Sequence, residues 1–229
     1  MSERQHRAIR SFTLRQGRLT PGQQKALADL WPRFGLEPGP NAIADSGLDL
    51  SRPLLVEIGF GNGEALAQMA GQRPEANFIG IEVHGPGVGH VLQLLAQREL
   101  DNVRIFRHDA MEVLGQALAP ASLDGVHLFF PDPWPKARHH KRRIVNPGFL
   151  SLLADKLKPS GYFHAATDWR PYADWMLERL AADQRFSNAN PNGGFTIKPD
   201  WRPLTKFERR GLTLGHEVFD LLFYRDTEA

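Results

Sequence analysis

The sequence of 229 residues contains no cysteine, which excludes disulfides, thiolate metal sites and cysteine nucleophiles. It has no apolar run that approaches a membrane span, and its arginine-containing start lacks the apolar segment of a signal peptide. No internal repeat or low-complexity tract stands out either. We therefore expect a cytoplasmic protein that makes no use of a membrane.

The net charge is also low, at a formal +2, so the distribution of charge matters more than its total. Five arginines are clustered between residues 4 and 18, and a second basic block runs from Lys136 to Arg143. The apolar fraction of 41% and the charged fraction of 24% are those of an ordinary globular protein. We expect a flexible basic arm over 1–20, a single α/β domain over 21–229, and a polyanionic partner.

The stretch Leu54–Glu64, LLVEIGFGNGE, predicts a strand, a glycine turn and a helix in succession. Its first residues are branched and apolar, which suits a strand buried on both faces. Gly59, Gly61 and Gly63 then alternate where the backbone must bend and leave room for a ligand. The following helix offers free N–H groups at its first turn, so this unit predicts a nucleotide-binding site.

Two details disfavour a dinucleotide. The G-x-G-x-x-G pattern of pyrophosphate binding places its third glycine one residue later than Gly63. Glu57 also lies just before the turn, where a carboxylate would repel pyrophosphate but favour a cation, such as the amino group or sulfonium of S-adenosylmethionine. Glu82 ends the next predicted strand, in the position from which an acid grips ribose hydroxyls.

Strands and helices are predicted to alternate through the rest of the chain, which indicates a parallel sheet covered on both faces. The predicted strands are 54–58, 78–83, 102–107, 125–130 and 161–166, and the predicted helices are near 63–72, 87–98, 110–117, 147–157 and 171–183. Pro21, after Thr20, could begin a further helix. Phe207–Leu212 and Val218–Tyr224 are predicted to form a closing antiparallel hairpin, turned at 214–216.

An acidic residue lies at or just after the end of each predicted parallel strand. A single acid there is commonly a helix cap, and this alternative is open for Asp109 in particular. Five acids at corresponding strand ends instead converge on one crevice, which favours a binding site. They are Glu57, Glu82, Asp109, Asp132 and Asp168.

The segment Leu128–Trp134, LFFPDPW, leads from a predicted strand directly into Pro-Asp-Pro-Trp. The flanking prolines restrict the backbone around Asp132 and present one acid and one indole rigidly at the switch point of the sheet. Trp134 has two open interpretations, packing within the protein or stacking on a nucleobase.

The block KARHHKRR follows at once, and we name residues 136–143 the basic rim. A run of charge is commonly a solvated surface, but its position against PDPW favours binding of phosphates, and its distribution suits a folded RNA. Metal binding by His139 and His140 is disfavoured because no third ligand occurs at a suitable spacing, so we expect no metal.

Together these motifs resemble the bacterial tRNA (guanine-N7)-methyltransferases, which modify guanosine 46 in the tRNA variable loop. The resemblance covers nearly the whole chain. The matching motifs are IRSF and RQGR within 9–18, VEIGFGNG, GIEVHGPGVG, HDA at 108–110, FFPDPWPK followed by RHHKRR, ATDW at 166–169, LTKFERRG at 204–211 and GHEVFDLLF.

This resemblance implies a Rossmann-like class I methyltransferase fold, a doubly wound and mostly parallel sheet of seven strands, with S-adenosylmethionine as cofactor. It implies that Asp132 is catalytic, that tRNA is the partner, and that a monomer or homodimer acts without an obligatory protein partner. The implied cofactor-binding residues are Glu57, Gly59, Gly61, Gly63, Glu82, Asp109 and Asp132. The implied substrate-binding residues are Lys136, Asp168, Thr205, Lys206, Phe207 and Glu208, and the implied RNA-binding residues are Arg138, His139, His140, Lys141, Arg142 and Arg143.

Three alternatives stay open at this point. The chain could be a class I methyltransferase that acts on another RNA or on protein. It could be an RNA-binding module that retains the fold without turnover, although such a module gains nothing from Glu57. A dehydrogenase that uses NAD is disfavoured by the glycine spacing and by the lack of a convincing proton donor.

Overall fold

The structure is a computed structural model that describes residues 10–13, 17–213, 215 and 217–227. Within these residues no helix is long and apolar enough to cross a membrane. The strands are β1 (Gly35–Leu36), β2 (Leu54–Ile58), β3 (Asn77–Ile81), β4 (Val103–Phe106), β5 (Leu123–Phe129), β6 (Leu157–Thr167), β7 (Phe186–Asn188) and β8 (Phe219–Arg225). The helices are α1 (Pro21–Phe34), α2 (Glu64–Gln72), α3 (Gly85–Gln97), α4 (Ala110–Gln116), α5 (Pro147–Lys156), α6 (Arg170–Ala182) and α7 (Lys206–Thr213), and two 3-10 helices are η1 (Ala44–Ser46) and η2 (Ala137–Arg142).

All eight strands form one sheet with the order β1-β4-β3-β2-β5-β6-β8-β7. The neighbours from β1 to β6 are parallel, and β8 is antiparallel to both β6 and β7. The strand order therefore reverses beside β2, whose neighbours are β3 and β5, and this switch point is where ligands bind in doubly wound sheets. The predicted doubly wound fold is confirmed, with the short β1 as an additional edge strand.

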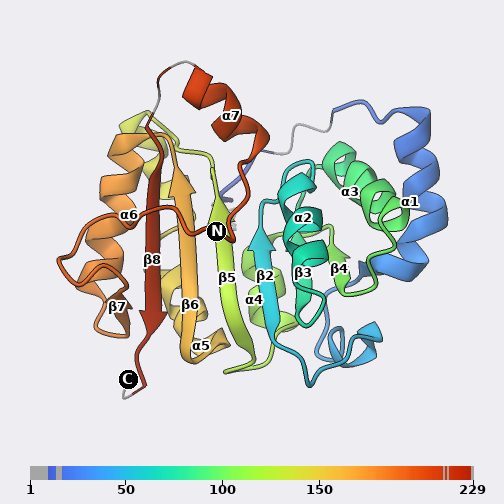
Figure 1. Cartoon of the computed structure of the whole chain (residues 1–229), viewed down its shortest axis with the longest axis horizontal. Helices are drawn as coiled ribbons and strands as arrows, with labels where there is room; N and C mark the ends of the chain where they lie inside the picture. Colours follow the sequence, from blue (N-terminus) through green and yellow to red (C-terminus); the bar gives the residue numbers. More distant parts are fainter. Residues whose placement is uncertain (1–9, 14–16, 214, 216, 228–229) are drawn as a thin grey trace, which may run out of the picture.

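Helices cover both faces of the sheet, and each face has its own apolar core. Leu66, Val91 and Leu92 of α2 and α3 belong to one core, together with Ala26 of α1. Residues of α4, α5 and α6, such as Leu114, Phe149 and Met176, belong to the other. Figure 1 shows α1, α2 and α3 gathered at one end of the sheet, while the segment between β7 and α7 passes in front of β8 and β6.

The start of α1 follows the prediction. Thr20 is the N-cap, its hydroxyl accepts a hydrogen bond from the Gln23 N–H, and the Gln23 side chain accepts from the Thr20 N–H. Pro21 occupies the first helical turn, where a missing N–H costs nothing. Of the predicted basic arm, residues 1–9 and 14–16 lie outside the described part of the chain.

The prediction of a hairpin over Phe207–Leu212 and Val218–Tyr224 is wrong in its first strand. The C-terminal antiparallel pair exists, but it consists of β7 and β8, and residues 206–213 form α7. Thr205 and Glu208 explain the difference, because their spacing is that of a capping box that starts a helix. Of the predicted turn, residues 214 and 216 lie outside the described residues.

Candidate active site

A cavity of about 360 Å³ opens at the carboxyl ends of β2, β3 and β5, beside the switch point of the sheet. The turns that follow these strands form its walls, and a segment from the start of the chain closes one side. The lining residues are Ser11, Phe12, Thr13, Ile58, Gly59, Ile81, Glu82, Val83, His84, His108, Ala110, Leu128, Phe129, Phe130, Pro131, Asp132 and Ile144. The sequence did not predict the contribution of residues 11–13.

The glycine turn after β2 is built to leave open space. Gly59, Gly61 and Gly63 have φ values of 71°, 62° and 78°, a region that other residues rarely adopt. A Cβ atom at Gly63 would lie 2.2 Å from Val91 Cγ2 of α3, so this glycine permits close packing. A Cβ atom at Gly59 or Gly61 would meet nothing within 4 Å, so these positions border free space that a ligand can occupy.

Glu82, at the end of β3, fixes the shape of this turn. Its Oε2 accepts a hydrogen bond from the Gly61 N–H at 3.0 Å. Its Oε1 accepts from the N–H groups of Val83 and His84 at 2.7 and 2.9 Å. A carboxylate has about four acceptor sites, of which three are used here, so Oε2 of the half-buried Glu82 can accept one further hydrogen bond from a ribose hydroxyl.

Glu57 is a buried acid of β2 that does not itself line the cavity but directly precedes Ile58, which does. Its side chain is 3% exposed, and its Oε2 has no hydrogen-bond partner among the described residues. Burial, and then repulsion by Glu82, raises the pKa of Glu57 to about 8. A buried carboxyl group without a partner favours an incoming cation. The residues present therefore fit a cofactor with an ammonium group beside Glu57 and a ribose beside Glu82.

Asp109 is a helix cap. Its Oδ1 accepts a hydrogen bond from the Met111 N–H at 2.9 Å and so begins α4, which confirms the cap alternative left open by the sequence. The side chain is half-buried and lies between His108 and Ala110, which both line the cavity. A cap can also contribute to a ligand site, and contact with an adenine amino group stays a prediction.

The PDPW turn is fixed from several sides. Phe130 and Trp134 flank it with φ values of 51° and 46°, which are unusual for non-glycine residues. The Phe130 N–H donates to the Ala166 carbonyl of β6 at 2.7 Å, and the Arg143 Nε donates to the Pro133 carbonyl at 3.0 Å. This frame presents the exposed Asp132 at the cavity.

Trp134 joins the cavity to the basic rim. Its Nε1 donates a hydrogen bond to the Ser11 carbonyl at 3.0 Å, which ties the segment 10–13 to the PDPW turn. The Arg142 guanidinium lies 4.9 Å from the centre of the Trp134 ring system, and the His139 ring meets it edge-on at 5.8 Å. These contacts support the packing interpretation of Trp134.

The basic rim contains residues of two kinds. Lys136, Arg138 and Lys141 are exposed, whereas His139, His140 and Arg142 are half-buried. Partial desolvation, followed by the neighbouring cations, lowers the pKa of His139. Such a concentration of positive charge on η2 favours an anion.

Arg143 does not belong to the exposed surface of the basic rim, contrary to the expectation that it faces RNA. It is 3% exposed, and its guanidinium lies 4.9 Å from the centre of the Tyr172 ring and 4.7 Å from that of Trp175. Together with its hydrogen bond to Pro133, these contacts make Arg143 a support for the PDPW turn.

Apart from Lys136 of the basic rim, the predicted substrate-binding residues lie just after β6 or at the start of α7. Asp168 is exposed directly after β6. Thr205 caps α7 by accepting from the Glu208 N–H at 3.1 Å, whereas the Glu208 carboxylate is 3% exposed and bonded to Arg202. The side chains of Lys206 and Phe207 lie outside the described part of the structure. The sequence did not predict Arg202, because its partners lie 6 and 18 positions away in two other elements and no local pattern connects them.

Residues 51–221 match the family described as "Putative methyltransferase". A tRNA (guanine-N(7)-)-methyltransferase of Acidovorax sp. (strain JS42) is 52% identical over 220 residues, which cover 96% of this chain and 87% of the relative. One of Chromobacterium violaceum is 51% identical and covers 96% of both chains. The chain belongs to the tRNA (guanine-N(7)-)-methyltransferase family. The sequence resemblance is thereby confirmed.

Solved structures agree on the fold. The 16S rRNA methyltransferase KamB superposes with a TM-score of 0.58 at 15% identity and covers 92% of this chain and 95% of its own. A 16S rRNA (adenine(1408)-N(1))-methyltransferase from Catenulisporales acidiphilia, solved with SAM, has a TM-score of 0.53 at 18% identity and covers 93% and 94%. At such identities the likeness concerns the sheet and its helices.

Proposed function

We propose that this chain transfers the methyl group of S-adenosylmethionine to N7 of a guanosine in tRNA, at position 46 of the variable loop. The observation that carries the proposal is the place of Asp132, which borders the cavity and lies four positions before the first residue of the basic rim. The identity to tRNA (guanine-N(7)-)-methyltransferases supports the substrate. The 7-methylguanosine product follows from that chemistry.

Glu82, which lines the cavity, and two acids adjacent in sequence to lining residues, Glu57 and Asp109, would hold the cofactor by its polar groups. When bound, the cofactor supplies a methyl group on a positively charged sulfonium. Glu57 would pair with the amino group, Glu82 with a ribose hydroxyl, and Asp109 with the adenine amino group, while Gly59 and Gly61 leave the space. The unpartnered Glu57 Oε2 supports this arrangement, because a cation would give the buried acid its missing partner.

Guanine N7 needs no general base, because it carries a lone pair and no proton. Transfer of the methyl group to that lone pair would leave the positive charge on the purine. The chain therefore has to position the two reactants and stabilise the moving charge. Asp132, held by its proline frame, is the acid that we assign to this role.

Guanine and tRNA would be held along the edge that leads from β6 to the basic rim. Asp168 is exposed there and can accept hydrogen bonds from the guanine N1–H and N2–H₂ groups, which adenine does not offer. Lys136 and the first turn of α7, with Thr205, would contact the target nucleotide. Arg138, Lys141 and Arg142 would bind phosphates, and the half-buried His139 and His140 would line this surface.

The remaining expectations concern the setting of the reaction. We propose that the chain acts as a monomer or homodimer without an obligatory protein partner, because the cavity and the basic rim both come from one chain. A tRNA-modifying enzyme works where tRNA is processed, so we also propose a cytoplasmic location.

The test is incubation of the chain with methyl-labelled S-adenosylmethionine and an unmodified tRNA transcript, followed by nucleoside analysis. We expect labelled 7-methylguanosine from this tRNA and none from a matched transcript with adenosine at position 46. Label in another nucleoside, or in 7-methylguanosine at another position, would favour a different RNA substrate. Tight tRNA binding without any label transfer would favour a non-catalytic RNA-binding module.

A further inference from the structure

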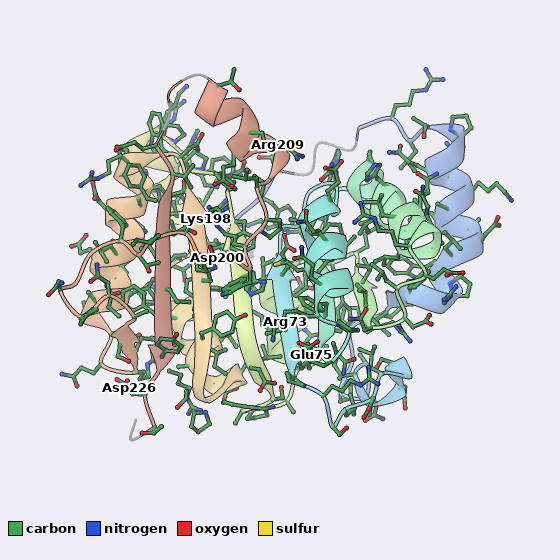
Figure 2. The ribbon with its side chains drawn as sticks, viewed as in Figure 1. Arg73, Glu75, Lys198, Asp200, Arg209 and Asp226 are labelled. Atoms are coloured by element: carbon green, nitrogen blue, oxygen red, sulfur yellow. The ribbon has the colours of Figure 1, made fainter. Side chains whose placement is uncertain are left out.

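Arg202 is the largest side chain that is fully buried in the described structure, at 0% exposure. It belongs to the segment between β7 and α7, which crosses the face of the sheet in front of β6. Lys198 and Asp200, labelled in Figure 2, lie on the same segment, and the Lys198 ammonium donates to the Arg202 carbonyl at 2.8 Å. Arg202 is thus shielded from solvent.

Two carboxylates form ion pairs with this guanidinium, although its Nε makes no hydrogen bond among the described residues. Its terminal nitrogens donate to Glu208 Oε2 at 2.6 Å and to Glu208 Oε1 at 2.8 Å. One of them also donates to Asp220 Oδ2 at 3.0 Å, and Nε lies 2.7 Å from Asp220 Oδ1. Asp220 accepts in addition from His164 Nε2 at 2.7 Å. We call Arg202, Glu208, Asp220 and His164 the Arg202 cluster.

The Arg202 cluster connects the start of α7 to β6, the strand that directly precedes Asp168. Asp220 of β8 pairs with Ala166 of β6, two positions before Asp168. Glu208 is in the first turn of α7 and shares a capping box with Thr205. The Arg202 guanidinium also lies 5.7 Å from the centre of the Phe129 ring, which lines the cavity.

Stability alone is a weak reason for this arrangement. Taking three charged groups out of water costs several kcal/mol per ion, and apolar residues of the same volume often serve a protein core equally well. A planar guanidinium held by two carboxylates instead fixes the relative orientation and separation of the segments that carry these groups, because each contact needs a particular geometry. In this molecule the cluster lies at the edge of the site where the target nucleotide would bind.

We propose that Arg202 is a positioning residue for methyl transfer, which holds the Thr205–Glu208 turn in register with Asp168. Within this arrangement Glu208 is the anchor of α7, and Asp168 is the acid that reads the guanine. Glu208 supports this division because it is 3% exposed and both of its oxygens face the guanidinium, whereas Asp168 is exposed. The inference rests on the proposed function and assigns separate roles to two acids within it.

The test compares single-turnover rates on two tRNAs at saturating cofactor. One tRNA carries guanosine at the target position and the other carries inosine, which keeps N7 but lacks the N2 amino group. We expect Arg202→Lys and Glu208→Gln to lower the rate by about 10-fold or more on both tRNAs, with the preference for guanosine retained. We expect Asp168→Asn to lose that preference. The double variant of Arg202 and Glu208 should lose little more than the worse single variant.

Controls separate positioning from a loss of folding. Each variant is first checked for cofactor affinity and melting temperature, and Glu208→Gln is the milder change because glutamine also completes a capping box. Arg185→Lys is the matched control, since Arg185 forms a bidentate pair with Asp183 away from the site, at 2.8 and 2.7 Å. It should leave the rate unchanged.

A rate for Arg202→Lys equal to that of the wild type would overturn the proposal. So would loss of the guanosine preference in Glu208→Gln with retention in Asp168→Asn, or equal rates of the wild type on the two tRNAs. A wild-type protein that forms no 7-methylguanosine at all would instead contradict the proposed function, which keeps the two failures distinct.

Discussion

Glu57 and Glu208 are two glutamates of equal burial in opposite electrostatic situations. Each is 3% exposed. Glu208 faces the Arg202 guanidinium with both carboxylate oxygens, so its charge is matched within the chain. Glu57 Oε2 has no hydrogen-bond partner in the described residues, and burial raises the pKa of Glu57 to about 8. An acid that is paired within the chain holds parts of the fold together, whereas a buried acid without a partner is available to a ligand.

The largest expected effect follows from removing the matched acid. Glu208→Ala would leave the Arg202 guanidinium buried with only part of its charge compensated. We expect the free energy of unfolding to fall by about 3–5 kcal/mol, measured by urea denaturation without ligands. A loss below about 1 kcal/mol, the usual value of an exposed ion pair, would remove the distinction between the two glutamates.

Removal of Glu57, the unmatched acid, should change the free energy of unfolding in the opposite direction. The pKa of Glu57 is about 8 in the folded protein and near 4.5 in the unfolded chain, so the folded state binds more protons between these values. Stability therefore falls as the pH rises through this window, by up to about 1.4 kcal/mol per pH unit. Glu57→Gln should abolish that slope and weaken cofactor binding. If stability depends on pH in the same way in Glu57→Gln and in the wild type, Glu57 is not a buried acid without a partner.

Asp132 provides the exposed counterpart to both buried acids. If its fixed charge stabilises the methylated, cationic guanine, asparagine should fail nearly as badly as alanine despite keeping an acceptor oxygen. We expect Asp132→Asn to lose at least about 10²-fold in single-turnover rate, the order of one preorganised electrostatic contact. Recovery of the rate at saturating cofactor and tRNA would make Asp132 a binding residue.

A substitution of Glu82 tests cofactor binding, with a smaller expected effect. Glu82→Gln should weaken S-adenosylmethionine binding by about 1.5–3 kcal/mol, the range for a lost hydrogen bond to a charged group. Calorimetry measures this affinity directly, and tRNA affinity without cofactor serves as the control that should barely change. Wild-type cofactor affinity in this variant would exclude Glu82 from the site.

The smallest effect is expected at the basic rim, where Arg142 and Arg143 form a natural pair. Arg142→Ala should reduce the slope of log affinity for tRNA against log salt concentration by about one, as for one lost phosphate contact. Arg143→Ala should leave the slope unchanged and lower stability instead, because Arg143 is 3% exposed. Equal changes of slope in both variants would contradict the separation of surface and support.

The sequence predicted the features that depend on neighbouring residues. The strand over 54–58, the glycine turn and the start of α1 follow from local apolar pattern, turn chemistry and capping. The capping rule also explains why the predicted strand over 207–212 is wrong. Thr205 and Glu208 have the spacing of a capping box, which starts a helix at this place.

Features that depend on tertiary contacts were not predicted. A run of basic residues does not reveal which member turns inward, so Arg143 was placed with the exposed cations. The partners of Arg202 come from α7 and β8, and no local pattern connects them. The contact between Ser11 and Trp134 joins residues that lie 123 positions apart. Such pairs are determined by the folded sheet and not by sequence spacing.

The most direct test of the central contrast is the number of protons released when S-adenosylmethionine binds. An acid with a pKa of about 8 is mostly protonated at pH 7, and pairing with the cofactor ammonium group should cause it to lose its proton and become charged. Calorimetry in buffers of different ionisation enthalpy should therefore find the release of nearly one proton from the wild type and none from Glu57→Gln. Release of no proton by the wild type, or of the same number by both proteins, would contradict the assignment of Glu57 as the acid that awaits the cofactor.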